Sequence, residues 1–255
     1  MFHCAADVRT WGPRQDFWAA NVVGLANLLE AFSLAGTLPG HLVHFSSVDV
    51  YGFPSGPAPE SSRLQPTGFG YGDSKQAGEQ LLRARAAALG LSYTILRPCN
   101  VMGAGSPFID RIGRKLRSGL MFRVGDGRVH CGYLDVDNLV DVALWAARSP
   151  AAGGETFNVR DPMDLDWRTF LHDLRQALQG RGTVLSLPYG VAMASARVLS
   201  GPYRVLHLRQ EPLLHPLLVQ IFGRTCGHSI DKIRAAGAPL GRVSYTQSLA
   251  SALAV

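Results

Sequence analysis

The sequence predicts an α/β fold in which a parallel β-sheet is covered by helices on both faces. Short runs rich in β-branched and aromatic residues alternate with longer helical patterns along roughly the first 160 residues. The chain has 255 residues, 47% of them apolar and 17% charged. This is enough apolar material to bury one large core, or one core with a small lobe beside it.

The expected strands and helices follow one another in a regular order. A first long helix is indicated because apolar residues recur at i, i+4, i+7, i+11 and i+14 from Trp18 to Phe32, and Gly36 follows as its stop. Strands are expected at residues 2–4, 41–45 and 93–96, and helices at about 15–35, 71–89, 107–117 and 139–147. After the run 157–159 the pattern becomes more helical and irregular, which predicts a smaller lobe.

The charge pattern gives little support to a nucleic-acid partner. The formal charge of +6 comes mostly from arginines scattered along the chain rather than from one basic block. A positive field of this kind favours an anionic small molecule. We therefore predict no nucleic-acid partner.

The four cysteines predict neither a metal site nor a disulfide. Cys4, Cys99, Cys131 and Cys226 are far apart and form no CxxC pair or Cys/His group with the spacing of metal ligands. The N-terminus lacks the basic and apolar regions of a signal peptide, and prolines and arginines interrupt the apolar stretches near the C-terminus. We therefore expect a cytoplasmic protein with no spanning segment, and peripheral membrane contact stays open.

A tyrosine and a lysine four residues apart carry the sharpest local signal. Tyr71 and Lys75 project from one face of the expected helix. A lysine ammonium beside a phenol favours the phenolate and lowers the phenol pKa, which would give an acid/base group usable near neutral pH. Taken alone, however, this spacing is more often a solvated pair on a helix surface.

Ser47 adds a second polar group at the carboxyl end of an expected buried strand. Open parallel sheets present their ligand-binding groups at this edge. The Ser47 hydroxyl could therefore hydrogen-bond the same substrate oxygen as Tyr71. The alternative is that Ser46 and Ser47 form a turn or a helix cap.

Five short motifs occur together in one order and at consistent spacing. They are Phe2 to Ala6, Asn21 to Gly24, Ser46 to Gly52, Tyr71 to Lys75 and Leu96 to Pro98. Each motif is weak, but the ordered set resembles the extended short-chain dehydrogenase/reductases, a superfamily that includes NAD-dependent epimerases and dehydratases. The resemblance covers residues 1 to about 180. It implies a Rossmann-like doubly wound sheet with NAD or NADP as cofactor.

The resemblance also implies roles for individual residues. Ser47, Tyr71 and Lys75 match the catalytic triad: Tyr71 exchanges the hydroxyl proton, Ser47 holds the substrate oxygen, and Lys75 binds the nicotinamide ribose and tunes Tyr71. Further cofactor contacts are implied for Ala5, Ala6, Asn21, Ser46, Pro98, Asn100 and Val101. For Asn21 a polar surface position on an amphipathic helix is an equal alternative, and ordinary packing or turn formation is the alternative for the alanines and for 98–101.

The chain departs from the family at its beginning. Family members open with a strand, a Gly-rich turn and a helix whose N-terminus holds the pyrophosphate. Residues 1–255 contain no GxGxxG run, and residue 1 resembles the start of the fourth family strand. We expect a fragment, a misplaced start codon or a degenerate copy. Residues 1–160 would then be a partial nucleotide-binding domain with the catalytic residues, and 161–255 a mostly helical substrate lobe.

The substrate must be predicted from the later motifs. Cys131-Gly132-Tyr133 stands where nucleotide-sugar enzymes often carry an Arg-Asp-Phe-like element. Together with Gly125-Asp126-Gly127 it resembles the 3β-hydroxysteroid and sterol dehydrogenases, and the apolar segment 213–222 suits an alicyclic alcohol, although such a stripe is more often core. The resemblance implies an oxidoreductase acting on a CH–OH group of a small alcohol or ketone. The alternatives are a nucleotide-sugar epimerase or dehydratase, and a non-catalytic binding protein without cofactor. A homodimer is left open.

Overall fold

Four parallel strands form the centre of the molecule. The structure, a computed structural model, describes residues 1–253. The strands lie in the order β1 (Phe2–His3), β2 (Leu42–Phe45), β3 (Tyr93–Pro98) and β7 (Thr156–Val159), and each neighbouring pair is parallel. The predicted α/β class with a parallel, Rossmann-like sheet is confirmed.

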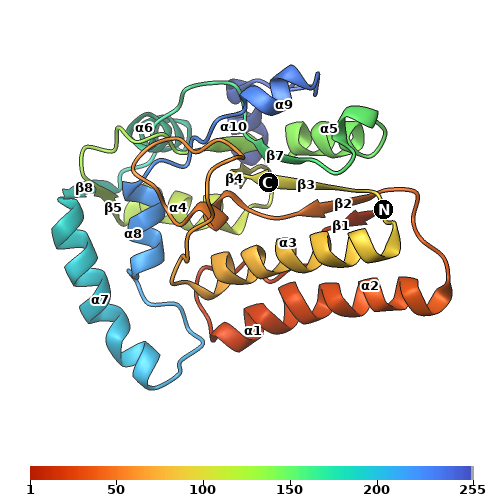
Figure 1. Ribbon diagram of the computed structural model, residues 1–255. Helices are drawn as coiled ribbons and strands as arrows, with labels where there is room; N and C mark the ends of the chain where they lie inside the picture. Colours follow the sequence, from red (N-terminus) through yellow and green to blue (C-terminus); the bar gives the residue numbers. More distant parts are fainter. Residues whose placement is uncertain (254–255) are drawn as a thin grey trace.

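Helices cover both faces of this sheet (Figure 1). One face carries α3 (Gly70–Leu89) and a continuous helical run made of α1 (Arg14–Trp18), a π-helical turn η1 (Ala19–Val23) and α2 (Gly24–Ala35). The opposite face carries α5 (Val136–Ala146) and α9 (Asp231–Ala235). Apolar side chains fill the two interfaces, with Leu25, Leu29, Leu82 and Ile95 fully buried on the α2–α3 side.

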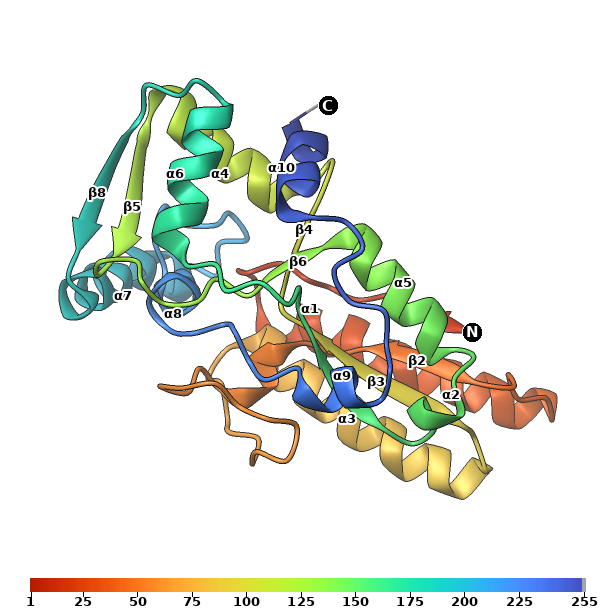
Figure 2. The ribbon, with the colours of Figure 1, turned by 90° about the horizontal axis from the view of Figure 1, so that it is seen from above.

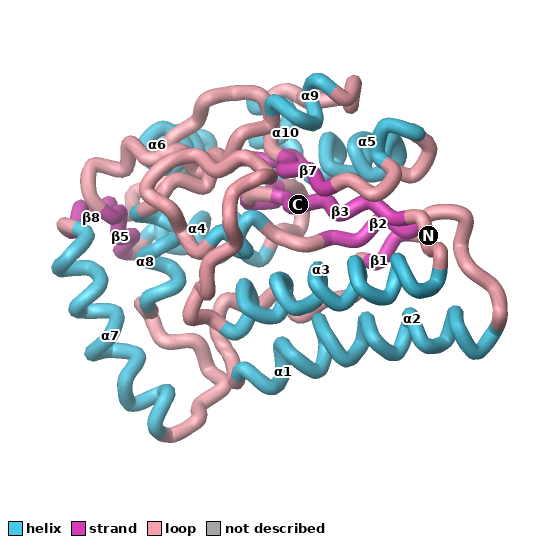
Figure 3. The backbone as a smooth tube through the Cα atoms, in the orientation of Figure 1, coloured by secondary structure: helices cyan, strands magenta, loops and turns pink. Residues whose placement is uncertain are grey.

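The lobe lies beyond the carboxyl ends of the central strands (Figures 1 and 2). It contains two small parallel sheets, β4–β6 and β5–β8, and 3-10 turns η2 and η3 lie closer to the central sheet. The bounds are β4 (Asn100–Met102), β5 (Leu120–Val124), β6 (Tyr133–Asp135), β8 (Thr183–Leu187), α4 (Pro107–Ser118), α6 (Trp167–Ala177), α7 (Tyr189–Val205), α8 (Pro216–Gly223), α10 (Tyr245–Leu253), η2 (Val48–Tyr51) and η3 (Pro150–Ala152). Loops gather between the central strands and the lobe (Figure 3).

Packing links the two predicted domains closely. Strand β5, at residues 120–124, pairs with β8, at residues 183–187. Ile109, Ile112 and Leu116 of α4 share a buried cluster with Trp167 of α6. The division at residue 160 stays a prediction. Residues 107–124 lie with the lobe, because their apolar side chains are buried in its core.

One helical run meets the length and hydropathy expected of a membrane-spanning segment. Residues Arg14–Ala35 form 22 helical residues with a mean hydropathy of 1.3 in their most apolar window. Core helices of other proteins pass the same test, so this is weak evidence. The absence of a spanning segment therefore stays a prediction. The cytoplasmic location stays a prediction.

Candidate active site

The start of α3 places Tyr71 and Lys75 against the end of β2. Lys75 is 4% exposed, and its Nζ donates a hydrogen bond of 2.8 Å to the carbonyl oxygen of Phe45, the last residue of β2. The same Nζ lies 5.9 Å from the centroid of the Tyr71 ring. Because the ammonium has three donors, two remain for a ligand.

Ser47 follows β2 and is 7% exposed. It is the N-cap of η2, and its Oγ accepts a hydrogen bond of 3.2 Å from the backbone N–H of Asp49. The cap expected as an alternative is therefore present. A hydroxyl can accept this bond and still donate its own proton, so the cap leaves Ser47 able to contact a substrate oxygen.

One cavity of about 600 Å³ brings together six of the residues singled out in the sequence. This volume is in the usual range for a small-molecule site. The six residues that line it are Ser46, Ser47, Tyr71, Lys75, Pro98 and Val101. Ala5, Ala6, Asn21 and Asn100 are not among the lining residues.

Apolar residues that the sequence did not single out form the rest of this wall. They come mainly from β1, from the segment after it and from α5, with Phe45 at the end of β2 and Cys99 directly after β3, and include Phe2, Cys4, Val8, Val136, Val140 and Leu144. Val136, Val140 and Leu144 recur at i, i+4 and i+8 on α5 and are 39%, 47% and 41% exposed. Their spacing indicates one helix face, but spacing alone does not tell whether that face lines a cavity or a core.

Asn21 holds the segment after β1 against α3. It lies in the π-helical turn and is 3% exposed, so the alternative of a polar surface position is wrong. Its amide makes two hydrogen bonds with the backbone of Asp7, and Nδ2 also lies 2.9 Å from Ser74 Oγ. Ser74 Oγ in turn donates to the carbonyl of Tyr71 at 2.7 Å. These bonds fix the backbone of Asp7 against α3 near Tyr71, and the predicted contact of Asn21 with a cofactor stays a prediction.

Asn100, the other predicted amide, is held by the lobe. Its Nδ2 donates a hydrogen bond of 2.6 Å to the carbonyl of Cys131. This bond joins the start of β4 to the segment before β6. The predicted contact of Asn100 with a cofactor stays a prediction.

Burial controls the acid/base properties of the site. Desolvation lowers the pKa of Lys75 to about 8, although the charge of Glu79 acts in the opposite direction. Desolvation also raises the pKa of Tyr71, the charge of Asp49 raises it further, and a hydrogen-bonding interaction with Ser47 lowers it. The sequence predicted a lowered Tyr71 pKa. In this structure the direction is opposite, because burial of the phenol outweighs any effect of the neighbouring ammonium.

Asp49 is a titratable group that the sequence did not single out. Desolvation raises the pKa of its carboxyl from 3.8 to about 7. The folded protein thus keeps a proton on Asp49 that the unfolded chain loses above about pH 4. The protonated Asp49 carboxyl therefore stabilises the folded state fully below about pH 4. This stabilisation is lost as the pH rises through about 7.

We expect Asp49→Asn to raise the free energy of unfolding relative to the natural chain by roughly 3 kcal/mol at pH 8, and by little at pH 4. The amide cannot ionise, so it avoids the cost of a buried charge. Urea unfolding across this pH range measures the difference. Asp231→Asn, at a side chain 83% exposed, is the matched control and should change the free energy of unfolding by less than about 1 kcal/mol. The same difference at pH 4 and at pH 8 for Asp49→Asn would contradict the raised pKa.

A buried ion pair lies next to the cavity and bonds to Ser46, one of its lining residues. Arg97 donates to both carboxylate oxygens of Glu79, at 2.8 and 2.6 Å, and the two side chains are 3% and 1% exposed. Ser46 Oγ donates to Glu79 at 2.6 Å. Arg97 also donates to the Tyr51 hydroxyl, which donates to Asn158. These bonds tie α3, η2, β3 and β7 together next to the cavity.

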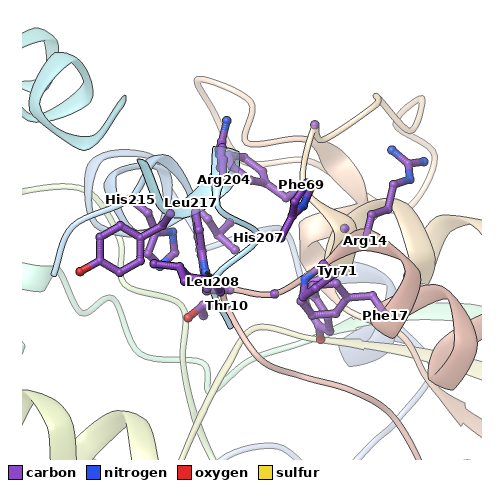
Figure 4. A pocket seen from close by; sticks show the side chains of 16 residues that line it. Thr10, Arg14, Phe17, Phe69, Tyr71, Arg204, His207, Leu208, His215 and Leu217 are labelled. Carbon is purple, nitrogen blue, oxygen red and sulfur yellow. Dashed lines mark hydrogen bonds between the residues drawn. The ribbon is translucent and has the colours of Figure 1, made fainter. Parts of the chain in front are cut away.

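A second cavity of about 240 Å³ adjoins Tyr71 on the side of the lobe. Figure 4 shows Tyr71 and Phe17 on one side of it, with His215 and Leu217 on the other. Its other walls come from residues 10–14, from residues 68–70 and from the end of α7. Tyr71 lines both cavities, so it stands between them.

The apolar segment 213–222 proves to be mainly core. Leu218, Val219, Ile221 and Phe222 belong to the largest buried cluster, whereas Leu217 also reaches the second cavity. The alternative of ordinary packing therefore describes most of this segment. Within residues 1–253, no group of three or more His, Cys, Asp or Glu side chains is placed to hold a metal ion. All four cysteines are free thiols.

Comparison with known proteins identifies the family. The model of the NAD dependent epimerase/dehydratase family matches residues 1–159. The chain belongs to this family. The match covers the central sheet and all six predicted residues that line the larger cavity.

Curated relatives of the chain include epimerases and ketone reductases. The chain is 28% identical to an Escherichia coli N-acetyl-alpha-D-glucosaminyl-diphospho-ditrans,octacis-undecaprenol 4-epimerase, over 71% of this chain and 55% of that protein. It is 29% identical to a Stigmatella aurantiaca 4-hydroxy-2-methyl-3-oxo-4-farnesyl-3,4-dihydroquinoline-1-oxide ketoreductase, over 98% of this chain and 75% of that protein. A human sterol-4-alpha-carboxylate 3-dehydrogenase, decarboxylating, is 24% identical over 92% of the chain, which spans 66% of its length.

Solved structures support the fold. UDP-glucose 4-epimerase of Thermotoga maritima, in a complex with UDP-glucose, superimposes with a TM-score of 0.73 at 21% identity, over 98% of this chain and 74% of that chain. RMD from Pseudomonas aeruginosa, complexed with NADPH, superimposes with a TM-score of 0.71 at 21% identity, over 99% of this chain and 79% of that chain. At such identity the likeness shows the fold alone.

Proposed function

We propose that this protein is an NAD(P)-dependent oxidoreductase acting on a CH–OH group, with Tyr71 as acid/base, Ser47 as the group that holds the substrate oxygen, and Lys75 as the cation that binds the cofactor ribose. The observation that carries the proposal is the single cavity at the carboxyl ends of β2 and β3, which all three side chains line. Family membership supports it.

The donors at this cavity fit the nicotinamide end of a dinucleotide. Lys75 is charged below about pH 8 and has two N–H donors not used by Phe45. Bound NAD(P) would supply or accept the hydride. Ser47 donates to the alcohol or carbonyl oxygen, and Tyr71 takes or returns its proton. In an oxidation Tyr71 must first give its phenolic proton to water, or to Lys75 in its neutral form, because the raised pKa keeps the phenol protonated.

The second cavity favours an apolar substrate. Aromatic and aliphatic side chains dominate its walls, among them Trp11, Phe17, Phe69, Tyr203, Leu208 and Leu217. The names of the relatives above include a ketoreductase and a sterol-4-alpha-carboxylate 3-dehydrogenase. We therefore propose an alicyclic or long-chain secondary alcohol, or its ketone, as substrate. We also propose that residues 1–160 bind the cofactor and 161–255 help to bind this substrate.

A substrate panel tests this function. Purified protein is assayed for NAD(P)H formation with 3β-hydroxysteroids and other apolar secondary alcohols, and separately for interconversion of UDP-sugars. Cofactor is supplied at high concentration, because no Gly-rich turn for the pyrophosphate occurs in residues 1–255. Oxidation of the apolar alcohols with no sugar epimerisation is the expected result. Sugar epimerisation alone would contradict the proposal in favour of the epimerase, and calorimetry showing no binding of either cofactor would favour a non-catalytic binding protein.

A further inference from the structure

Helix α7 lies at the margin of the lobe with most of its surface uncovered (Figures 1 and 2). Its buried residues are Ala192, Ala196 and Ser200, which follow one another at i and i+4 and form a single narrow face. Small side chains on that face let α7 pack closely on the lobe. Tyr189 and Met193 also pack against the core of the lobe, and most of the other α7 side chains are exposed.

The outer face of α7 carries an apolar stripe. Val191, Val198 and Val205 recur at i, i+7 and i+14, and are 52%, 75% and 78% exposed. At 100° per residue this stripe lies opposite the buried alanines. Leu206, 66% exposed, follows directly at the end of the helix. We call these four residues the α7 outer surface.

Positive charge flanks the α7 outer surface. Arg197 and Arg204 precede Val198 and Val205, so they form a parallel row along one side of the valines. Residues 174–210 contain arginines but no aspartate or glutamate. The combination of an exposed aliphatic stripe and a basic border is typical of helices that lie in the interface of a bilayer.

We propose that the α7 outer surface docks on an anionic lipid bilayer. The three valines and Leu206 would enter the boundary between headgroups and acyl chains, and Arg197 and Arg204 would contact lipid phosphates. A second copy of this chain fits less well, because a twofold contact would bring the arginines of the two α7 helices together, and α7 itself carries no carboxylate. A nucleic acid would contact the arginines but would leave the apolar valine side chains exposed to water.

Docking in this way would place the smaller cavity at the lipid boundary. Tyr203, Arg204, His207 and Leu208 form part of its wall and belong to the end of α7 or the segment after it. An apolar substrate could then reach Tyr71 without crossing water. This consequence rests on the proposed function, whereas membrane docking itself does not.

Co-sedimentation with vesicles tests the proposal. The natural chain should bind vesicles of mixed phosphatidylcholine and phosphatidylglycerol, bind phosphatidylcholine alone much less, and lose affinity as salt is added. The double variant Val198→Asp/Val205→Asp should bind the anionic vesicles at least about tenfold more weakly, because it places charges where apolar side chains enter lipid. Arg197→Glu/Arg204→Glu should lose the preference for anionic lipid.

Leu34→Asp is the matched control. Leu34 is 82% exposed on α2, within the other apolar helical run of the chain. This variant should bind as the natural chain does. Loss of binding in Leu34→Asp but not in the valine variant would overturn the proposal in favour of residues 14–35. Two other results would overturn it: no vesicle binding by the natural chain, or a dimer without lipid that the valine variant dissociates in sedimentation velocity.

Discussion

Replacing Tyr71 with phenylalanine is expected to lower the rate of alcohol oxidation by at least about 100-fold. The substitution removes one hydroxyl and keeps the ring that separates the two cavities, so substrate and cofactor affinity should change little. The rate falls because no other phenol lines the larger cavity among the described residues, and the Ser47 hydroxyl is a far weaker acid. Initial rates at saturating substrate, together with calorimetric cofactor titration, separate chemistry from binding.

Tyr93→Phe is the matched control for this experiment. Tyr93 lies at the opposite end of β3 from the cavity and packs against the α2–α3 core. Its variant should keep the natural rate. Full activity of Tyr71→Phe would contradict the acid/base role, and equal losses in both variants would point to a general effect on folding.

Replacing Arg97 with leucine is expected to cost about 3–5 kcal/mol in the free energy of unfolding. The variant leaves the Glu79 carboxylate 1% exposed and without its bidentate partner. It also removes the donor to the Tyr51 hydroxyl. Arg83, 41% exposed and 3.5 Å from Glu79, would remain as a longer and more solvated partner. The buried carboxylate would therefore be poorly compensated or would take up a proton, and either change destabilises the folded state.

Urea unfolding of Arg97→Leu and of a control, Arg234→Leu, measures this cost. Arg234 pairs with Asp231 at the surface, where the two side chains are 54% and 83% exposed. That pair should contribute less than about 1 kcal/mol. A double variant Glu79→Met/Arg97→Met should recover part of the loss, because it leaves neither charge of this pair in the interior. Equal effects of Arg97→Leu and Arg234→Leu would contradict a dominant role for the buried pair.

The elements of the central sheet could be predicted from local sequence. Helix α3 is an example: it begins at Gly70 and ends at Leu89, within one residue of the predicted start, because apolar spacing and the C-terminal glycine are local signals. Gly90 adopts a φ of 68°, a conformation that glycine reaches at low cost. The continuity of the helix over 15–35 was also predicted, but the π-helical turn at Asn21 was not.

The parallel α/β fold and the order of the motifs that carry Ser47, Tyr71 and Lys75 could be predicted from the sequence, since both depend on short-range periodicity and on residues that follow strands. The groups that surround these three residues become known only from the folded chain. Glu79 meets Arg97, and α5 completes the cavity, through contacts between distant segments. The raised pKa of Tyr71 also results from contacts between distant segments. Desolvation depends on all the groups packed around the phenol, and the spacing of residues along the chain does not specify those groups.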